Sequence, residues 1–210
     1  MIVSPSEIPY SELYGIVLNS VGPRPIAWVS TLSSSGQRNL APFSFFNAVC
    51  MDPPVLAFAP GLRPPKAQGP GEIPGEAKDT LRNIRETKEF VVNIVTYELA
   101  EAMNLTSGEY DPSIDEFALA KVNPEPSKIV RAPRVAESPV SFECRLHQII
   151  DFSNRPTSSS LVMGQVVSIH MSDAHMKDGK LDRNSLDLIG RMGGIQYTRT
   201  SQRFDMVRPK

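Results

Sequence analysis

The clearest structural signal in the chain is the stretch VSFECRLHQII at residues 140–150. Apolar and polar side chains alternate along most of its length. A period of two places alternate side chains on opposite faces of a strand, so the stretch predicts a β-strand with one buried and one solvated face. The buried face would hold Val140, Phe142, Cys144, Leu146 and Ile150, and the solvated face Ser141, Glu143, Arg145 and His147.

Strand signals continue on both sides of this stretch, whereas helix signals are few. SSLVMGQVVSIHM at residues 159–171 predicts a second long strand, in which Gly164 marks a bulge or a close approach. Shorter strands are predicted by PIAWVSTL (25–32), VLAFAP (55–60) and FVVNIV (90–95). Two helices are predicted, one at residues 78–90 with Asp79 as its N-cap and one at 97–108 that Gly108 can close. This balance favours a mainly β barrel.

Two proline-rich stretches interrupt the strands. GLRPPKAQGPGEIPG at residues 61–75 cannot hold regular structure and predicts a long loop, and residues 123–139 form a second such stretch. Loops of this length in a compact domain are usually functional or mobile. Without repeats or a clear linker, residues 1–210 are expected to form a single domain.

Composition excludes several classes of function. The formal net charge is −1 and the basic residues are scattered, which argues against partners such as nucleic acid or a membrane surface. Only Cys50 and Cys144 are present, without a CxxC motif, which favours a reducing compartment over a disulfide framework. No secretory signal and no membrane-length apolar run is visible, so we expect a soluble, cytoplasmic protein whose partners are small molecules or another copy of itself.

Common nucleotide, nucleophile and metal motifs are missing. GPGEIPG at residues 69–75 has the wrong spacing for a dinucleotide-binding loop, and neither a P-loop nor a G-x-S-x-G motif occurs. Cys144 and His147 are an odd number of residues apart on a predicted strand and therefore point to opposite faces. His170 and His175 are separated by a predicted turn. We therefore expect no metal site.

The stretch RNLAPFSFFN at residues 38–47 has two interpretations. If it is extended, Ala41, Phe43, Phe45 and Asn47 share one side, and Pro42, Ser44, Phe46 and Ala48 the other. Pro42 cannot donate a ladder hydrogen bond, so it marks an edge or a break in strand pairing. Backbone groups beside such a break are free for a ligand, and Ser44 adds a hydroxyl. The alternative is that the aromatic residues simply fill a core.

A possible anion site lies at residues 78–80. Lys78 and Thr80 stand at the start of a predicted helix, where free backbone N–H groups and the helix dipole attract negative charge. A phosphomonoester would suit this arrangement. The alternative is a surface helix that Asp79 merely caps.

Five ordered segments resemble one known family. They are GPRPIAWVSTLSSSGQRNLAPFSFFNAVCMDPPVLAFAP (22–60), KDTLRNI (78–84), FVVNI (90–94), LVMGQVVSIH (161–170) and GRMGGIQY (190–197). Together they are similar to the flavin reductase-like, FMN-binding split-barrel family, and within it to the flavoprotein oxygenase or nitrilotriacetate monooxygenase component B type. The resemblance implies a six-stranded Greek-key split β-barrel with flanking helices, forming a homodimer with FMN near the subunit interface.

The resemblance also implies cofactor-binding residues. Ser30 and Thr31 would lie near the flavin, and Lys78 and Thr80 would meet its phosphate. Arg191, in GRMGG, would approach the cofactor or support its pocket. The ring and ribityl chain would be lined, largely by backbone atoms, by Ala41, Pro42, Phe43, Ser44, Phe45 and Asn47. No side chain need act as a catalytic acid or base, because the cofactor carries the chemistry.

The implied function is an FMN-dependent oxidoreductase that takes hydride from NADH or NADPH and passes electrons to free flavin, oxygen or a partner oxygenase. The chain lacks the late Gly-Asp-His-like element that NADH-using reductases of this type often carry, so nicotinamide use stays open. One alternative is a non-catalytic FMN electron-transfer protein resembling flavoredoxin. Another is a split barrel that binds a different ligand or none.

Overall fold

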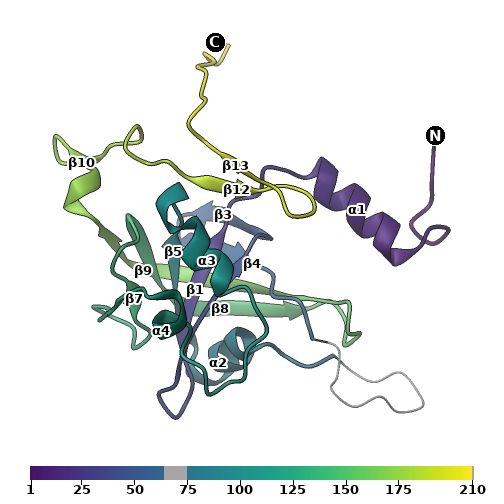
Figure 1. Cartoon of the computed structure of the whole chain (residues 1–210), viewed down its shortest axis with the longest axis horizontal. Coiled ribbons are helices and arrows are strands. Elements are labelled where there is room, and N and C mark those ends of the chain that lie inside the picture. The colour runs from purple at the N-terminus through teal and green to yellow at the C-terminus, as the bar shows by residue number, and fades with distance from the viewer. Residues whose placement is uncertain (64–74, 210) are drawn as a thin grey trace.

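The computed structural model describes residues 1–63 and 75–209 and is built around a seven-stranded antiparallel sheet (Figure 1). The order of the strands is β2-β1-β5-β8-β9-β4-β3. Their bounds are β1 (Ala27–Leu32), β2 (Arg38–Phe43), β3 (Phe46–Met51), β4 (Pro54–Phe58), β5 (Glu89–Ile94), β8 (Val140–Asp151) and β9 (Ser160–Met171). The loop expected at residues 61–75 falls mostly outside the described residues.

The sheet is curled into a split barrel. β2 and β3 lie at opposite ends of the strand order, yet only Ser44 and Phe45 connect them. Two residues span too short a distance to cross an open sheet, so the two edges must approach each other. The expected mainly β split barrel is confirmed. The sheet has seven strands, where the resemblance implied six, because the run from Arg38 to Met51 bends at this connection and is divided into β2 and β3.

Short elements surround the barrel. The helices are α1 (Tyr10–Ser20), α2 (Asp79–Thr87), α3 (Ala100–Leu105) and α4 (Glu116–Ala120), with 3-10 turns η1 (Tyr97–Leu99) and η2 (Asp173–His175). Three small hairpins pair β6 (Pro124–Glu125) with β7 (Arg134–Val135), β10 (Met176–Lys177) with β11 (Lys180–Leu181), and β12 (Ile189–Arg191) with β13 (Tyr197–Arg199). The two predicted helices are therefore present, although the second is shorter than expected.

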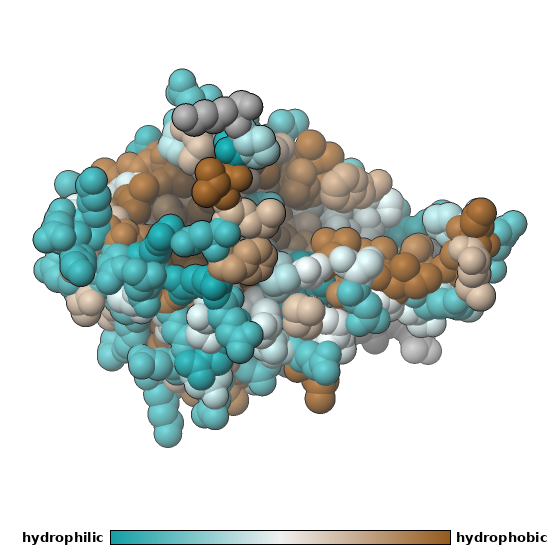
Figure 2. Space-filling view, turned by 90° about the horizontal axis from the view of Figure 1, so that it is seen from above, coloured by the Kyte–Doolittle hydropathy of each residue, from teal (hydrophilic) through white to brown (hydrophobic). Residues whose placement is uncertain are grey.

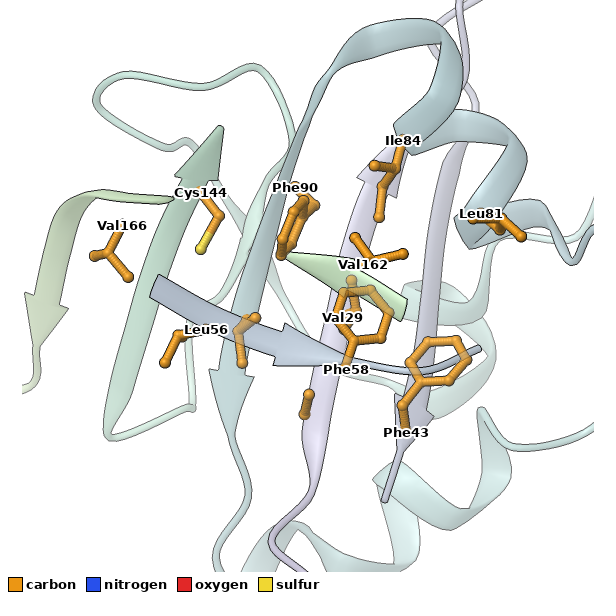
Figure 3. Packing of buried hydrophobic residues seen from close by; sticks show 12 residues of the cluster. Val29, Phe43, Leu56, Phe58, Leu81, Ile84, Phe90, Cys144, Val162 and Val166 are labelled. Carbon is orange, nitrogen blue, oxygen red and sulfur yellow. The ribbon is translucent and has the colours of Figure 1, made fainter. Parts of the chain in front are cut away.

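The main core fills the barrel and is closed by α2 (Figure 3). The rings of Phe43 and Phe58 lie 5.0 Å apart, and those of Phe58 and Phe90 lie 5.5 Å apart in an edge-on arrangement. Leu81 and Ile84, three residues apart on α2, are fully buried against them, as their spacing predicted. Burial of each such side chain is worth about 1.5–3 kcal/mol, so α2 is held by packing as well as by its own hydrogen bonds.

Gly164 makes the close approach that the sequence suggested. A Cβ atom at this position would lie 2.3 Å from Cζ of Phe90 and 3.0 Å from Cβ of Cys144. No larger residue fits beside the Phe90 ring without moving it. At Gly164, β9 therefore packs directly against the core ring of Phe90.

The expected solvated face of β8 is partly wrong. Glu143 and Ser141 are buried, with 0% and 1% of their surface exposed. The loop after β6 covers this face, and the Glu143 carboxylate accepts hydrogen bonds from the backbone N–H groups of Lys128, Ile129 and Val130. His170 on β9 also contacts it. A polar residue in an alternating pattern is buried here because a distant loop supplies the donors that water would otherwise supply.

Two further sequence expectations are corrected. Helix α2 begins at Asp79, with Lys78 as its N-cap, and the Asp79 carboxylate pairs with Arg63 and Arg82 instead of capping the helix. Phe43 and Phe46 were expected on opposite sides of an extended segment, but both pack on the barrel core, whereas Phe45 is 42% exposed. The bend between β2 and β3 interrupts the alternation of faces, so the pattern of β2 does not continue into β3.

Candidate functional site

A cleft of about 480 Å³ opens where the two edges of the barrel meet, and we call it the main cleft. Its walls come from α1, the β2–β3 connection, the residue before α2, residues 156–159 and the end of β12. These segments are far apart in the sequence. Among the predicted site residues, the lining includes Pro42, Phe43, Ser44, Phe45, Lys78 and Arg191.

The charged residues of the main cleft all have one sign. Arg24, Lys78 and Arg191 line it, and none of the described lining residues is an Asp or Glu. Three cations without a carboxylate form a site for a negatively charged ligand. The remaining wall is aromatic or small and polar, from Tyr10, Tyr14 and the residues of the β2–β3 connection.

Arg24 is the best defined of these cations. It is 5% exposed, and its guanidinium donates to the carbonyl oxygens of Leu18 at 2.9 Å, Val21 at 2.5 Å and Met192 at 2.8 Å. It forms no ion pair with any described residue, and its buried Nε has no hydrogen-bond partner among them. A buried charge without an opposite charge is costly. An anionic ligand in the cleft would compensate it.

Backbone pairing sets Arg24 beside Arg191. The N–H of Arg24 donates to the carbonyl of Arg191 at 3.0 Å, and the N–H of Arg191 donates back at 2.8 Å. The Arg191 guanidinium lies over the ring of Tyr197, 4.5 Å from its centroid. The β12–β13 hairpin thereby brings the second arginine to the same wall. In the hairpin turn, Gly194 has φ +57°, a left-handed conformation that glycine adopts readily.

Lys78, which directly precedes α2, also lines the main cleft. Its side chain makes no capping hydrogen bond and is half-buried. The first backbone N–H groups of an α-helix have no acceptor within the helix, and the helix dipole adds partial positive charge there. A lysine next to such a helix end is suited to a phosphate group. Helix α2 is packed firmly on the core, so this end is well fixed.

The β2–β3 connection forms the flat, apolar part of the wall. β2 pairs with β1 along one edge only, and on its other edge Leu40 donates its N–H to Glu116 at 3.1 Å. Pro42 has no N–H, but the pairing of β2 with β1 continues through it to Phe43, so Pro42 marks the edge strand and not a break in the ladder. The carbonyl of Phe45 accepts from the N–H of Ala59 at 2.8 Å. The chain is thus anchored on both sides of Ser44.

Five predicted site residues do not line the main cleft. Ser30 is fully buried and donates to the Pro133 carbonyl at 2.5 Å. Ala41 packs against the barrel core. Asn47 is exposed, and its side chain accepts from the next backbone N–H at 2.9 Å.

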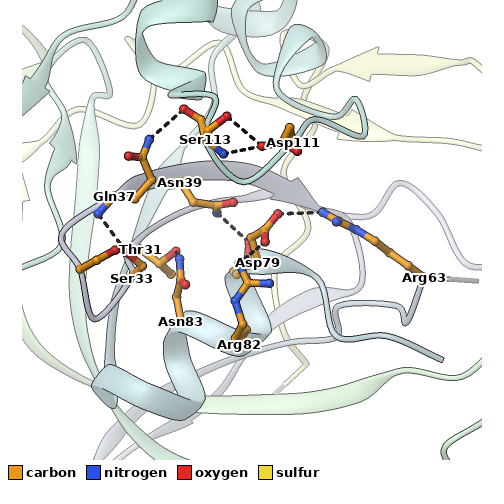
Figure 4. Close-up of polar contacts among 12 residues, drawn as sticks. Thr31, Ser33, Gln37, Asn39, Arg63, Asp79, Arg82, Asn83, Asp111 and Ser113 are labelled. Atoms are coloured by element: carbon orange, nitrogen blue, oxygen red, sulfur yellow. Dashed lines mark hydrogen bonds and ion pairs between the residues drawn. The ribbon is translucent and has the colours of Figure 1, made fainter. Parts of the chain in front are cut away.

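The other two, Thr31 and Thr80, belong to a polar network between β1, β2 and α2. Figure 4 shows Thr31, Asn39 and Asn83 of this network. Thr31 accepts a hydrogen bond from the Asn83 side chain at 3.0 Å, and Thr80 accepts one from the Asn39 side chain at 2.9 Å. Both threonines are buried, with at most 1% of their surface exposed. These hydrogen bonds hold α2 against β1 and β2, and so fix the position of Lys78 directly before the helix.

Sequence reasoning missed Arg24 and the tyrosines of α1. Arg24 lies between two prolines in GPRP, a signal for a rigid extended segment but not for a buried charge. Helix α1 carries no buried residue, and its sequence lacks a strong apolar stripe, so no periodic pattern predicted this helix. Figure 1 shows it standing apart from the barrel.

Two carboxylates outside the main cleft have shifted pKa values. Burial raises the pKa of Glu116 from 4.5 to about 7, although the hydrogen bond from the Leu40 N–H acts to lower it. Burial alone would also raise the pKa of Glu143, but hydrogen bonds from His170 and three backbone N–H groups outweigh it and lower the pKa to about 2.

Within the described ranges, no three His, Cys, Asp or Glu side chains gather as metal ligands would. No helix in the same ranges is long and apolar enough to cross a membrane.

The chain belongs to the flavin reductase like domain family, whose model matches residues 20–185. It is 39% identical over 188 residues to an uncharacterized protein of Aquifex aeolicus, covering 89% of each chain. Its fold resembles nitrilotriacetate monooxygenase component B from Bacillus cereus, with a TM-score of 0.88, 30% identity and 98% of each chain covered. It also resembles the 2-nitrobenzoate 2-nitroreductase of Pseudomonas fluorescens, with a TM-score of 0.85, 32% identity, and 100% of this chain and 96% of that chain covered. A flavin as cofactor or substrate follows from the family.

Proposed function

We propose that the main cleft binds FMN and that the chain is an NAD(P)H-dependent flavin reductase or the reductase component of a two-component monooxygenase. The observation that carries this proposal is the charge of the cleft, which has Arg24, Lys78 and Arg191 on its walls and no carboxylate among the described lining residues. Its size, about 480 Å³, is within the range of small-molecule sites. Family membership supports the flavin.

In this proposal each part of the cleft has a separate task. Lys78 and the first N–H groups of α2 hold the phosphate. The chain from Pro42 to Phe45 lies along the flat ring system, with Ser44 as a hydroxyl partner. Arg24 and Arg191 supply fixed positive charge at the opposite wall, which favours negative charge on the ring. The five predicted residues outside the cleft lining are proposed to support these groups and not to contact the cofactor directly. They are Ser30, Thr31, Ala41, Asn47 and Thr80.

The bound flavin would supply hydride and electron transfer, so the chain's own residues bind, orient and exclude water. For this reason we assign no catalytic acid or base. NADH or NADPH is the proposed reductant, and free flavin, oxygen or a partner oxygenase is the proposed acceptor. A cytoplasmic setting is part of the same proposal and is supported by the absence of paired cysteines in the sequence.

We further propose that the chain acts as a homodimer and forms one domain over residues 1–210. Support comes from exposed apolar surface on the elements beside the cleft. Strand β3 is an edge strand with Val49 56% and Met51 74% exposed. Helix α1 has no buried residue, and in Figure 2 the protrusion at the right carries apolar side chains. An isolated helix of this length is marginal in water, so packing against a second copy would stabilise it.

The absorption spectrum of the purified protein tests the proposal. A yellow protein that releases FMN on denaturation would support it, and a colourless protein that does not quench added FMN would refute it. Anaerobic addition of NADH or NADPH should then bleach the bound flavin rapidly. Bleaching only by a reduced protein donor would favour the electron-transfer alternative of the flavoredoxin type.

A further inference from the structure

A second cleft of about 480 Å³ lies between α3 and the β12–β13 hairpin, and we call it the hairpin cleft. Figure 2, which looks down on the hairpin side, shows apolar side chains gathered in a hollow on this face. The apolar part of its lining is formed by Met103 and Ala100 on α3 and by Ile189 and Ile195 of the hairpin region.

The hairpin cleft is connected to the main cleft. A smaller pocket of about 170 Å³ lies between them. It shares Pro42, Ser44 and Arg191 with the main cleft, and Met103, Arg191 and Tyr197 with the hairpin cleft. Arg191 therefore belongs to all three, and a molecule in the hairpin cleft could reach the β2–β3 connection past Ser44.

Flat aromatic surfaces and arginines face each other at the rim. The guanidinium of Arg199 lies 3.9 Å from the centroid of the Tyr97 ring, and that of Arg191 lies 4.5 Å from the centroid of the Tyr197 ring. Stacking on a ring holds a guanidinium in one plane and leaves its N–H groups directed sideways. The N–H groups of Arg199 are used on Asp187, and Nη2 of Arg191 donates to the Gly194 carbonyl at 2.5 Å. The other guanidinium N–H groups of Arg191 have no acceptor among the described residues and can donate to a planar carboxylate.

The charges at the rim are equal in number but not all paired, since Arg191 and Arg199 stand against Glu101 and Asp187. Arg199 is paired with Asp187, and Glu101 also lines the hairpin cleft. Arg191 forms no ion pair with any described residue. The free positive charge is therefore at the end nearest the main cleft. A ligand with an apolar ring and one negative group would match this polarity.

We propose that the hairpin cleft is a second binding site, for a planar aromatic carboxylate whose acidic group is held by Arg191. Its ring lies between the apolar residues of α3 and the hairpin. The role of this molecule as a neighbour of the flavin rests on the proposed function, whereas its binding does not. The site is specific for shape as well as charge, because the flat rings of Tyr97 and Tyr197 favour an aromatic partner over a flexible chain.

The experiment titrates the full-length, FMN-supplemented protein by calorimetry with three probes. They are 2-naphthoate, its neutral analogue 2-naphthamide, and octanoate, which has the charge without the flat ring. We expect 2-naphthoate to bind at least about tenfold more tightly than either of the others, the ratio for losing about 1.4 kcal/mol. Equal binding of 2-naphthamide or octanoate would overturn the assignment.

Two variants separate this cleft from the main one. Ile195→Glu adds a carboxylate at a position that is 92% exposed and lines the hairpin cleft. It should weaken 2-naphthoate about tenfold or more and leave FMN affinity unchanged. Lys78→Ala should weaken FMN and leave 2-naphthoate affinity unchanged. Unchanged naphthoate binding in Ile195→Glu, or loss of it in Lys78→Ala, would overturn the proposal.

The same titrations show which proposal fails. A wild-type protein that binds 2-naphthoate but not FMN would contradict the proposed function and leave the second site standing. A protein that binds FMN but not 2-naphthoate would contradict the second site and leave the proposed function standing. Displacement of 2-naphthoate by saturating FMN would place it in the main cleft and refute the second site.

Discussion

Replacing Lys78 by alanine tests the anion end of the main cleft most directly. Its ammonium is half-buried, lines the cleft and makes no ion pair with any described residue. If it contacts the FMN phosphate, removing it costs one charge-assisted hydrogen bond, about 1–3 kcal/mol. This corresponds to an affinity about 5- to 150-fold weaker. The fold should not suffer, because the side chain does not cap α2.

Quenching of flavin fluorescence on binding provides the assay, carried out for wild type and Lys78→Ala at low and high salt. Lys128→Ala is the matched control, because it removes the same charge from an exposed side chain outside the main cleft. The loss in Lys78→Ala should shrink as salt screens the interaction in the wild type. The melting temperature of both variants should remain close to that of wild type.

The reasoning would be refuted by an unchanged FMN affinity in Lys78→Ala. It would also be refuted if Lys128→Ala weakened FMN equally, because the effect would then be one of net charge alone. Retention of riboflavin binding in Lys78→Ala, together with weakened FMN binding, would locate the lost interaction at the phosphate.

Three further predictions concern buried groups. Glu116 has a pKa raised to about 7 in the folded protein, so its ionisation costs stability as pH rises from about 4.5 to 7. With solvent screening, Glu116→Gln should gain about 1–2 kcal/mol relative to wild type between pH 5 and pH 8 in urea unfolding, and an equal difference at both pH values would contradict this. Glu143 has a pKa lowered to about 2, so its carboxylate contributes fully to the free energy of unfolding above pH 4.5 and loses this contribution as pH falls toward 2. Glu143→Gln should therefore be less stable than wild type at neutral pH, and the difference in stability should shrink in acid. Gly164→Ala should destabilise the protein by about 1–3 kcal/mol, because its methyl group would meet the Phe90 ring at 2.3 Å, and an unchanged melting temperature would show that the ring moves freely.

Much of the barrel could be predicted from local patterns. The long strands β8 and β9 and the strands β1, β4 and β5 each lie within or close to the runs that predicted them, because alternation and β-branched residues act over a few neighbours. The same holds for α2, whose Leu81 and Ile84 are both buried. Strand β3 was harder to predict, because the bend after β2 shifted which phenylalanine faces the core.

The candidate site divides in the same way. Residues within one segment, such as Pro42 to Phe45 and Lys78, could be proposed from a break in pairing and a helix start. Arg24 could not, because its position in the cleft depends on the Met192 carbonyl of the β12–β13 turn, which is 168 residues away in the sequence. The burial of Glu143 was not predicted for the same reason, since the N–H groups that bind its carboxylate lie on the loop after β6.

The sequence by itself determined five strands of the main sheet and the start of α2 to within one residue, and it contains no common nucleotide loop. The five strands are β1, β4, β5, β8 and β9. The tertiary structure decided how the two barrel edges meet, and with this which charges share a cleft. The physical reason is range. Backbone preferences and side-chain periodicity are local, whereas Arg24, Lys78 and Arg191 become neighbours only after the sheet has closed.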